Sequence, residues 1–549
     1  MNVLLISGMG PEVPNKKLLE GSSFQALLAP EAPEGHHAAA ARPDVFDLSL
    51  LRTAGGAGQP LLRPRRAGGR ARAVSSVRLT APAAEEAEPG KAPHLTTFTL
   101  QSILLAAGVD HEVFPIERIW TGSPVEPPTD MDVVLLSTTF IWDRRTLAKA
   151  VVWVEERFPT ADLVLGGQYS NLKFQRILAE HPFVRYIVRG DAEAALPALL
   201  RALRTKGDVA DVPNLVWRDP DTDRMRMTRI EYIDLDALPS PGPVGTLPVV
   251  PYESMRGCPF SCKYCSFPAA SPKWRYKSAQ KIADDFLRYR RENGAEYIKA
   301  LDSTFTVPPT RLRALLPLLA EADVGWEAYT RANSIRGRSV VDDLERAHCR
   351  ALSIGFESMN DTTLDHMHKQ VKARANRVAF ELLQDSSIHS FVSFIVGYPG
   401  ETPELFEDTR RFLVSEYSGQ FALYVFMMND ETMPIWQEAD RFGLEVFDLD
   451  GEAEDWTHCG MDSRTAAQLQ LETLREVRWK NDHAIARVWQ HGFESPLLPG
   501  RSPAQNAAVE KAVDRLGMLS ADVRDPAEAT RRRDRLLSDL AGHGVVTAR

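Results

Sequence analysis

Short apolar runs alternate with amphipathic stretches over most of this sequence, and this alternation restricts its fold more than any other feature. In the first part of the chain, the runs at 3–7, 133–137, 163–167 and 186–190 have the length and content of buried strands. Between and after them, 147–157 and 192–203 have helical periodicity. Strands that alternate with helices form doubly wound parallel sheets. We therefore predict an α/β domain over residues 1–205.

A second set of strand and helix patterns begins near residue 250. The segment before it, 206–250, contains PNLVWRDP and LPSPGPVGTLP, whose prolines and glycines are typical of a linker. Six strand candidates, each followed by a helical pattern, lie at 252–257, 296–302, 325–333, 351–358, 389–397 and 421–428. We predict a partial (β/α)6 barrel over 251–435, followed by a mainly helical region over 436–549.

Amino-acid composition indicates where the protein is located and which partners it does not bind. Residues 31–92 are rich in Ala, Arg, Gly and Pro and lack the apolar density of a core, so we predict a long, low-complexity loop there. The net charge of −9 gives no basic excess for a phosphate backbone, so nucleic acid is not an expected partner. No apolar run approaches the roughly 20 residues of a membrane helix, and the N-terminal run lacks the flanks of a signal peptide. We expect a cytoplasmic protein without membrane contact.

Three of the five cysteines, Cys258, Cys262 and Cys265, lie close together after the first predicted barrel strand. In a reducing compartment such clustering indicates metal rather than disulfides. A loop this tight can wrap three thiolates around three irons of a cubane cluster and leave the fourth iron open. Zinc is the alternative, although tetrahedral zinc usually takes a second pair of cysteines or histidines, and none lies nearby in sequence.

The segment 255–268, MRGCPFSCKYCSFP, resembles the radical S-adenosylmethionine (SAM) superfamily, and the resemblance extends over residues 250–430. It implies a 4Fe-4S cluster on the three cysteines, with SAM on the open iron, cleaved to a 5′-deoxyadenosyl radical. Tyr264 would cover the cluster and help to orient the adenine.

Downstream segments resemble the strand ends of the same family, where a parallel barrel presents its ligands. In IGFES, Glu357 would meet the ribose or methionine end of SAM, and in FIVGYPGET, Gly397 and Gly400 would let backbone approach the adenosine. ALDSTF and YTRAN resemble the second and third strand ends, which makes Asp302, Ser303 and Arg331 expected cofactor-binding residues. Each segment also has a plainer interpretation: a structural ion pair for Glu357, and for GYPGET a turn before a helix that Thr402 caps.

The α/β domain before the barrel is similar in layout to the cobalamin-dependent radical SAM methyltransferases. Flavodoxin-like (Rossmann-type) cobalamin domains bind their ligand outside the carboxyl ends of the strands. The residues at those ends are Ser137, Thr138, Thr139, Gly166 and Gly167. The hydroxyls would bond the nucleotide tail, and the glycines would admit it against the sheet. Otherwise the hydroxyls cap the next helix and the glycines form an ordinary turn.

No Asp-x-His-x-x-Gly segment, which supplies a lower axial histidine in methionine-synthase-like domains, is present. His36, His37 and His94 lack that context. The resemblance then implies cobalamin with no histidine on cobalt, which favours reduction to cobalt(I).

The resemblance implies a methyltransferase that uses two SAM molecules. One methylates cobalt to give methylcobalamin, and the other is cleaved to the radical that activates the substrate. The acceptor would be an unactivated carbon or phosphinate phosphorus of a small-molecule or peptidic natural-product (antibiotic) intermediate, as in the phosphinothricin P-methyltransferase and tryptophan C2-methyltransferase types. Flavodoxin or ferredoxin would serve as the external one-electron reductant.

A last segment, WTHCGM at 456–461, resembles a W-x-H segment of several of these enzymes. His458 is therefore a candidate base or substrate contact, with a packed histidine as the alternative. Two other functions stay open: a radical SAM enzyme with a vestigial cobalamin domain that performs cyclisation or epimerisation, and a non-catalytic zinc or iron–sulfur protein.

Overall fold

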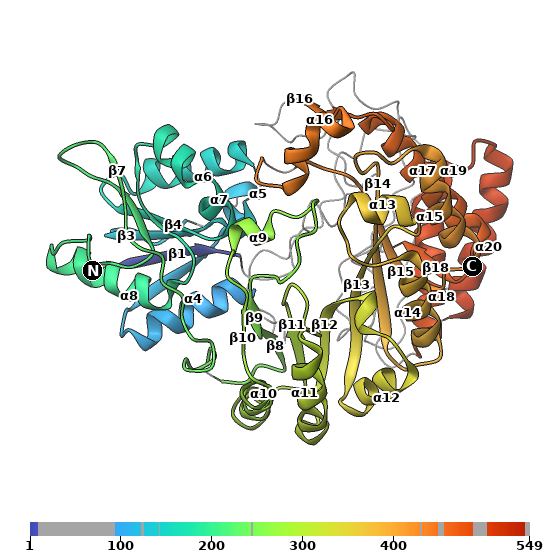
Figure 1. Ribbon diagram of the computed structural model, residues 1–549, viewed down its shortest axis with the longest axis horizontal. Helices are drawn as coiled ribbons and strands as arrows, with labels where there is room; N and C mark the ends of the chain where they lie inside the picture. Colours follow the sequence, from blue (N-terminus) through green and yellow to red (C-terminus); the bar gives the residue numbers. More distant parts are fainter. Residues whose placement is uncertain are drawn as a thin grey trace.

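The structure, a computed structural model, describes residues 1–8, 94–121, 126–141, 143–242, 245–428, 431–447, 455–486 and 502–543. The loop predicted over 31–92 lies outside these residues, as do His36 and His37. Figure 1 shows the N-terminal α/β domain beside a second sheet, whose far side carries the C-terminal helices. The predicted α/β class is confirmed.

The first sheet has seven strands in the order β2-β1-β3-β4-β5-β6-β7. The first five are parallel, and their order is that of flavodoxin-like folds. The last two are antiparallel. The strands are β1 (Val3–Ser7), β2 (His111–Pro115), β3 (Val133–Ser137), β4 (Asp162–Gly166), β5 (Val184–Val188), β6 (Leu215–Arg218) and β7 (Met225–Met227).

Strands β6 and β7 correct the predicted linker, because they lie inside 206–250 and extend the first sheet. Leu215 and Val216 of β6 are buried. The hairpin covers the open edge of β5, which would otherwise leave unpaired backbone groups. A four-residue strand next to a charged turn gives too little alternation to be recognised from sequence.

Helices cover both faces of the first sheet, so its central strands β1 and β3 are buried on both sides. Leu4 and Ile6 of β1 pack in one core with the helices α5 (Glu117–Thr121), α6 (Arg144–Arg157) and α7 (Gln168–Glu180). Val3 and Leu5 pack in the other with α4 (Leu95–Ala106) and α8 (Ala192–Thr205). Neighbouring residues of a strand point to opposite faces, which explains the unbroken apolar run VLLI.

The second sheet is fully parallel, in the order β18-β15-β14-β13-β12-β11-β8. It has one strand more than the six predicted, because β18 joins it from the region predicted to be mainly helical. Three residues are too few to produce a strand pattern. The strands are β8 (Val249–Tyr252), β11 (Tyr297–Ala300), β12 (Gly325–Arg331), β13 (Cys349–Glu357), β14 (His389–Val396), β15 (Gly419–Val425) and β18 (Ala484–Ala486).

Helices follow these strands and close one large core on the outer face of the sheet (Figure 1). Phe98 of α4 joins this core from the first domain and is buried in it. The helices are α10 (Ala279–Asn293), α11 (Pro309–Ala322), α12 (Arg338–Arg346), α13 (Asp361–His366), α14 (Ala373–Gln384), α15 (Pro403–Ser415), α17 (Ser463–Lys480), α18 (Pro503–Gly517), α19 (Leu519–Asp522) and α20 (Pro526–Gly542).

Two short hairpins complete the part of the fold that bears on the site. β9 (Met255–Arg256) and β10 (Arg275–Tyr276) enclose the cysteine loop and the one-turn helix α9 (Phe267–Ala270). β16 (Glu445–Phe447) and β17 (Asp455–Thr457) lie after the one-turn helix α16 (Ala439–Phe442). None of the described helices has the length and apolar character to cross a membrane.

Candidate functional site

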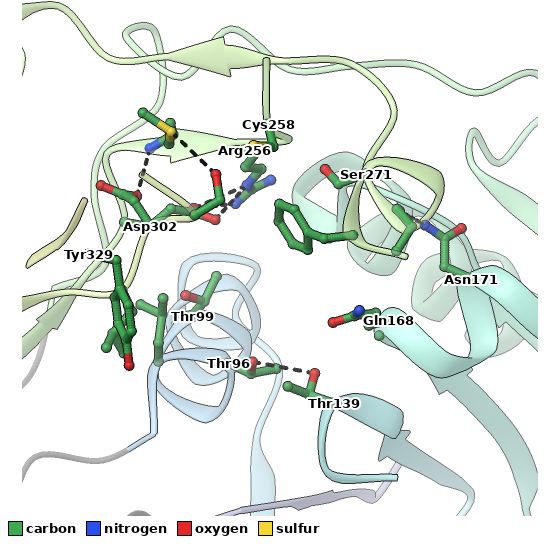
Figure 2. A pocket seen from close by; sticks show the side chains of 18 of the residues that line it. Thr96, Thr99, Thr139, Gln168, Asn171, Arg256, Cys258, Ser271, Asp302 and Tyr329 are labelled. Atoms are coloured by element: carbon green, nitrogen blue, oxygen red, sulfur yellow. Dashed lines mark hydrogen bonds and ion pairs between the residues drawn. The ribbon is translucent and has the colours of Figure 1, made fainter. Parts of the chain in front are cut away.

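A cavity of about 940 Å³ lies between the two domains, at the carboxyl ends of both parallel sheets. These ends are where α/β sheets and barrels hold their ligands. Figure 2 shows Thr96, Thr139 and Gln168 from the first domain facing Cys258 and Asp302 from the second across this space. The volume lies in the upper part of the range for ligand sites. The cavity therefore has room for large ligands at two chemically different ends.

The three cysteines line the second-domain end together. Their loop leaves β9 through Gly257, whose φ is +76° and whose added Cβ would lie 2.8 Å from the carbonyl oxygen of Lys273. A turn closes it, with Cys265 N donating to the Cys262 carbonyl oxygen over 3.2 Å. Burial raises the pKa of the Cys265 thiol to about 11. A bound metal deprotonates a thiol outright, so this group is suited to ligation rather than to acid–base chemistry.

The same thiols do not converge on one point. Among the described residues, no three His, Cys, Asp or Glu side chains are arranged to hold a single metal ion. A tetrahedral zinc site requires such convergence. In a cubane each cysteine binds a different iron, so the thiolates stand further apart. A donor set of three cysteines in one loop suits the cubane.

An ion pair lies beside the cysteines at the end of β13. Lys369 Nζ donates to Glu357 Oε1 and to Tyr264 Oη, each over 2.8 Å. Tyr264 Oη also donates to Glu357 over 3.1 Å. Glu357 adopts a φ of +64°, and a Cβ on Gly355 would clash with its carboxylate. Such backbone strain is typical of functional sites. Glu357 and Tyr264, two of the predicted site residues, line the cavity. Lys369 lines it as well, although a single lysine within HMHKQ did not predict a site residue.

Asp302 and Ser303 also line the cavity, but their bonds support the loop that carries the cysteines. Asp302 accepts from the backbone N–H of Ser254 at 2.7 Å and of Met255 at 3.0 Å. Ser303 Oγ donates to the Gly257 carbonyl oxygen over 2.9 Å. Burial raises the pKa of Asp302 to about 6. The two residues hold the start of the loop in place.

The first-domain end is a cluster of hydroxyl groups at the carboxyl end of β3. Ser137 Oγ lies 3.3 Å from Thr139 Oγ1, which in turn lies 3.5 Å from Thr96 Oγ1. Ser137 and Thr139 line the cavity. Ser137 also accepts from Thr139 N over 3.4 Å, so it caps the turn that follows β3. Thr138 differs from the prediction, because its hydroxyl is buried and bonds Ser170 Oγ and the Gly166 carbonyl oxygen, each over 3.0 Å.

The glycine pair after β4 lies in the same place. Gly166 and Gly167 both line the cavity. Gly167 has a φ of +117°, and an added Cβ would lie 2.9 Å from both Thr138 Oγ1 and Thr139 N. Glycine is therefore required for the close approach of this turn to the one after β3.

His94 also lines the cavity, although no role was predicted for it. It is the N-cap of α4, where Nδ1 accepts from Thr96 N over 3.2 Å. Its ring packs edge-on against Phe140 at 4.3 Å between centroids. Burial lowers the pKa of His94 to about 4, so the ring is neutral near pH 7. With Nδ1 accepting, Nε2 carries the proton. The position of His94 directly before a helix was the feature of the sequence from which this N-cap could have been predicted.

Gly397, Gly400 and His458 lie away from the cavity, which corrects three predicted site residues. A Cβ on Gly397 would meet Trp456 and Ala466 at 2.6 Å, and one on Gly400 would meet Phe442 at 2.6 Å. The protein's own side chains, rather than adenosine, fill the space that these glycines leave.

His458 belongs to the same packing. Its ring stacks on Trp456, Nδ1 accepts from Gly460 N over 3.0 Å, and Nε2 lies 3.2 Å from the Gly397 carbonyl oxygen. Both ring nitrogens are engaged with backbone, so the packed-histidine alternative describes the geometry. Thr402 caps α15 by accepting from Leu405 N over 3.3 Å, as the plainer interpretation of GYPGET requires.

Two arginines of the β9–β10 hairpin bind the first domain. Arg256 Nη1 donates to Asp191 Oδ1 over 2.9 Å and to Glu193 Oε2 over 3.0 Å. Arg275 donates to both oxygens of Asp191, over 2.7 and 3.0 Å. Asp191 is 3% exposed and precedes α8. This ionic cluster fixes the cysteine loop relative to the first domain.

Comparison with known proteins identifies the second domain. Residues 252–413 match the family model described as the Radical SAM superfamily. This second domain belongs to the radical SAM superfamily. The predicted radical SAM domain is confirmed, and such a domain implies a 4Fe-4S cluster and SAM as its cofactors.

Curated relatives match about half of this chain. An anaerobic magnesium-protoporphyrin IX monomethyl ester cyclase of Synechocystis is 25% identical over 46% of this chain and 53% of its own length. The cobalamin-dependent radical SAM methyltransferase TokK of Streptomyces tokunonensis is 25% identical over 57% of this chain and 49% of its own. The chain spans about half the length of these curated relatives.

Among solved structures, the radical SAM methyltransferase TsrM of Kitasatospora setae, with cobalamin and a 4Fe-4S cluster bound, has a TM-score of 0.55. It is 14% identical, and the match covers 84% of this chain and 98% of that one. The two proteins therefore share a fold over most of their lengths.

Proposed function

We propose that this protein is a cobalamin-dependent radical SAM methyltransferase that acts on a small-molecule or peptidic natural-product intermediate. The observation that carries the proposal is that one cavity joins the cysteine loop to the carboxyl ends of the first sheet. When bound, the cluster supplies the electron that cleaves SAM, and cobalamin supplies a carrier for the methyl group. A shared cavity lets both cofactors reach one substrate.

At the second-domain end, Cys258, Cys262 and Cys265 would hold the cluster. Lys369 fixes Glu357 beside the cysteine loop through a 2.8 Å contact in which both side chains are buried. A carboxylate held in this way can accept hydrogen bonds from the ribose or amino group of SAM. Tyr264, whose hydroxyl bonds the same pair, would form one wall of the SAM site.

At the first-domain end, the residues present fit a large ligand rich in amide and hydroxyl groups. Ser137, Thr139 and Thr96 offer hydroxyls, and Gly167 leaves backbone open to the cavity. His94 adds a neutral Nε2–H donor at the edge of the same space. These groups could bond the nucleotide tail and side-chain amides of cobalamin while the buried strands exclude water.

Space for the substrate lies where the barrel strands face the first domain. Leu301 and Tyr329 line the cavity and are 36% and 47% exposed, and Ser353 and Ser393 lie on the neighbouring strands. This lining offers apolar surface with a few hydroxyl groups. A neutral or partly apolar portion of a substrate suits this lining. An external one-electron donor of the flavodoxin or ferredoxin class would supply the electron that reduces the cluster.

The test is anaerobic reconstitution with iron, sulfide and hydroxocobalamin, followed by desalting and measurement of both metals. We expect about four irons and one cobalt per chain, and both 5′-deoxyadenosine and S-adenosylhomocysteine after addition of SAM and dithionite. Iron without cobalt would contradict the cobalamin half of the proposal. Cobalt with 5′-deoxyadenosine but no S-adenosylhomocysteine would contradict methyl transfer.

A second candidate, cyclisation by the same cofactors, is favoured by the similarity to the magnesium-protoporphyrin cyclase. The two functions differ in what becomes of the methyl group of SAM. A methyltransferase forms S-adenosylhomocysteine with each product, whereas a cyclase transfers no methyl group from SAM to its product. Mass spectrometry of the reaction with methyl-labelled SAM separates them.

A further inference from the structure

Arg331, the last residue of β12, lies against the cysteine loop with 6% of its surface exposed. Its Nη1 donates to Cys262 Sγ over 3.3 Å. Nη2 donates to the Lys369 carbonyl oxygen, and the guanidinium lies 3.9 Å from the centroid of the Phe260 ring. Because the guanidinium is planar and held on two further sides, its N–H group is fixed toward the sulfur.

The charge of Arg331 has no ion-pair partner among the described residues. The structure pairs no described carboxylate with it, and its buried Nε has no hydrogen-bond partner among the described residues. The neighbouring cations differ, since Lys369 pairs with Glu357 and Arg256 with Asp191, Glu193 and Glu253. Burial of an unpaired charge costs free energy, so a negatively charged group beside Arg331 would stabilise the fold. Cys262, whose Sγ lies 3.3 Å from Arg331 Nη1, becomes such an anion once a bound metal deprotonates its thiol.

A 4Fe-4S cluster with three thiolates carries a net negative charge, and reduction by one electron makes it more negative. Hydrogen bonds to the sulfurs and the net charge around a cluster are among the factors that set its reduction potential. A buried cation with an N–H on one ligand sulfur stabilises the reduced form more than the oxidised form. No bond forms or breaks in this step, and the electron comes from an external one-electron donor.

We propose that Arg331 raises the reduction potential of the cluster by acting through Cys262, as a positioning residue. The proposal depends on the three cysteines holding the cluster, and it requires neither cobalamin nor methyl transfer. It goes beyond the role in SAM binding expected of this position, because the effect is present in the cluster-loaded protein without SAM.

The experiment is a redox titration of the reconstituted protein without SAM, in which electron paramagnetic resonance follows the reduced cluster. Arg331→Met removes the charge and the donor, Arg331→Gln keeps an N–H donor, and Arg331→Lys keeps the charge. Arg311→Lys is the matched control, because Arg311 is also buried but donates to the carbonyl oxygens of Ser254, Lys277 and Phe305 and to no cysteine.

We expect Arg331→Met to favour the oxidised cluster about tenfold more than the wild type does, which is a shift of 59 mV to more negative potential for one electron. Arg331→Lys should shift less, and Arg311→Lys should match the wild type. An unchanged midpoint in Arg331→Met at full iron content would overturn the proposal. If that variant does not hold iron, unchanged midpoints in both Arg331→Gln and Arg331→Lys would overturn it. A wild type that holds no iron would instead overturn the cluster site and this inference with it, whereas absence of cobalt would leave the inference intact.

Discussion

At the scale of single residues, the first-domain end of the cavity depends on a glycine in a left-handed conformation. Gly167 combines a φ of +117° with atoms of Thr138 and Thr139 at 2.9 Å from an added Cβ. A side chain there strains the backbone and pushes the two turns that carry the hydroxyl groups apart. The position is therefore sensitive for both stability and ligand binding.

We expect Gly167→Ala to lower the free energy of unfolding by about 1–3 kcal/mol and to reduce cobalt retention after reconstitution with hydroxocobalamin. Gly443→Ala is the control, because Gly443 also has a positive φ but an added Cβ there meets no atom within 4 Å. That variant should show the smaller loss due to backbone conformation alone, about 1 kcal/mol, and normal cobalt retention. Equal behaviour of the two variants in denaturant unfolding and cobalt analysis would argue against the close approach.

His94 makes the stability of the fold depend on pH. Burial lowers the pKa of the folded imidazole to about 4 from an ordinary 6.5. Between these values the unfolded chain binds a proton that the folded chain does not, so stability is present above pH 6.5 and is lost as the pH falls toward 4. Asn is a good N-cap and does not titrate. Urea unfolding at pH 7.5 and pH 5 should show a steeper loss for the wild type than for His94→Asn; parallel losses would mean that this histidine is not neutral in the fold.

At the scale of elements, the β9–β10 hairpin and the start of α8 form one unit. Burial alone would raise the pKa of Asp191, but hydrogen bonds from Arg275 and the charge of Arg256 hold that pKa below its ordinary range. Both arginines flank the cysteine loop, so the contact that docks the two domains also positions the metal ligands. A change in docking should therefore reach the cluster.

Asp191→Asn tests this unit. Removal of one charge from a buried pair leaves the two arginines undercompensated, and we expect a loss of about 3 kcal/mol in the free energy of unfolding, together with easier cleavage between the domains in limited proteolysis. Glu416→Gln provides the comparison, since the Arg377–Glu416 pair is exposed, at 43% and 40%, and such pairs contribute at most about 1 kcal/mol. Similar stabilities of the two variants would show that the docking contact carries little energy.

At the scale of the whole molecule, two parallel sheets present their carboxyl ends to one cavity. Phe98 ties α4 of the first domain into the core of the second, and Asn171 of α7 donates to the carbonyl oxygen of Ala270 in α9. The two ends of the cavity are nevertheless built from separate sheets and separate cores. The cofactors should consequently load independently.

Cys262→Ala tests that independence. We expect the variant to lose most of its iron after reconstitution, because one of three ligands is missing, while it retains cobalt at the wild-type level. Cys349→Ala is the matched control, because Cys349 is a buried cysteine of β13 outside the cavity lining; it should keep both metals. Parallel loss of iron and cobalt in Cys262→Ala would indicate that the first-domain end forms only when the cluster is in place.

The sequence by itself determined the features that depend on neighbouring residues. The cysteine spacing placed three ligands in one loop, and the apolar runs located the parallel strands, because both signals act within a few residues. The turn residues Ser137, Thr139, Gly166 and Gly167 followed from the rule that ligands gather at strand ends. The short strands β6, β7 and β18 were not predicted, because three or four residues show no recognisable alternation of apolar and polar side chains.

Tertiary structure alone decided which distant side chains meet at these ends. Arg331 contacts a cysteine 69 positions earlier, and Lys369 reaches a tyrosine 105 positions earlier, because strand order and register bring their segments together. Gly397, Gly400 and His458 lie outside the cavity, because Trp456 and Phe442 pack against them. A sequence motif predicts which residues stand at the end of a strand. The neighbouring helices and strands determine whether those residues face a cavity or a packed core.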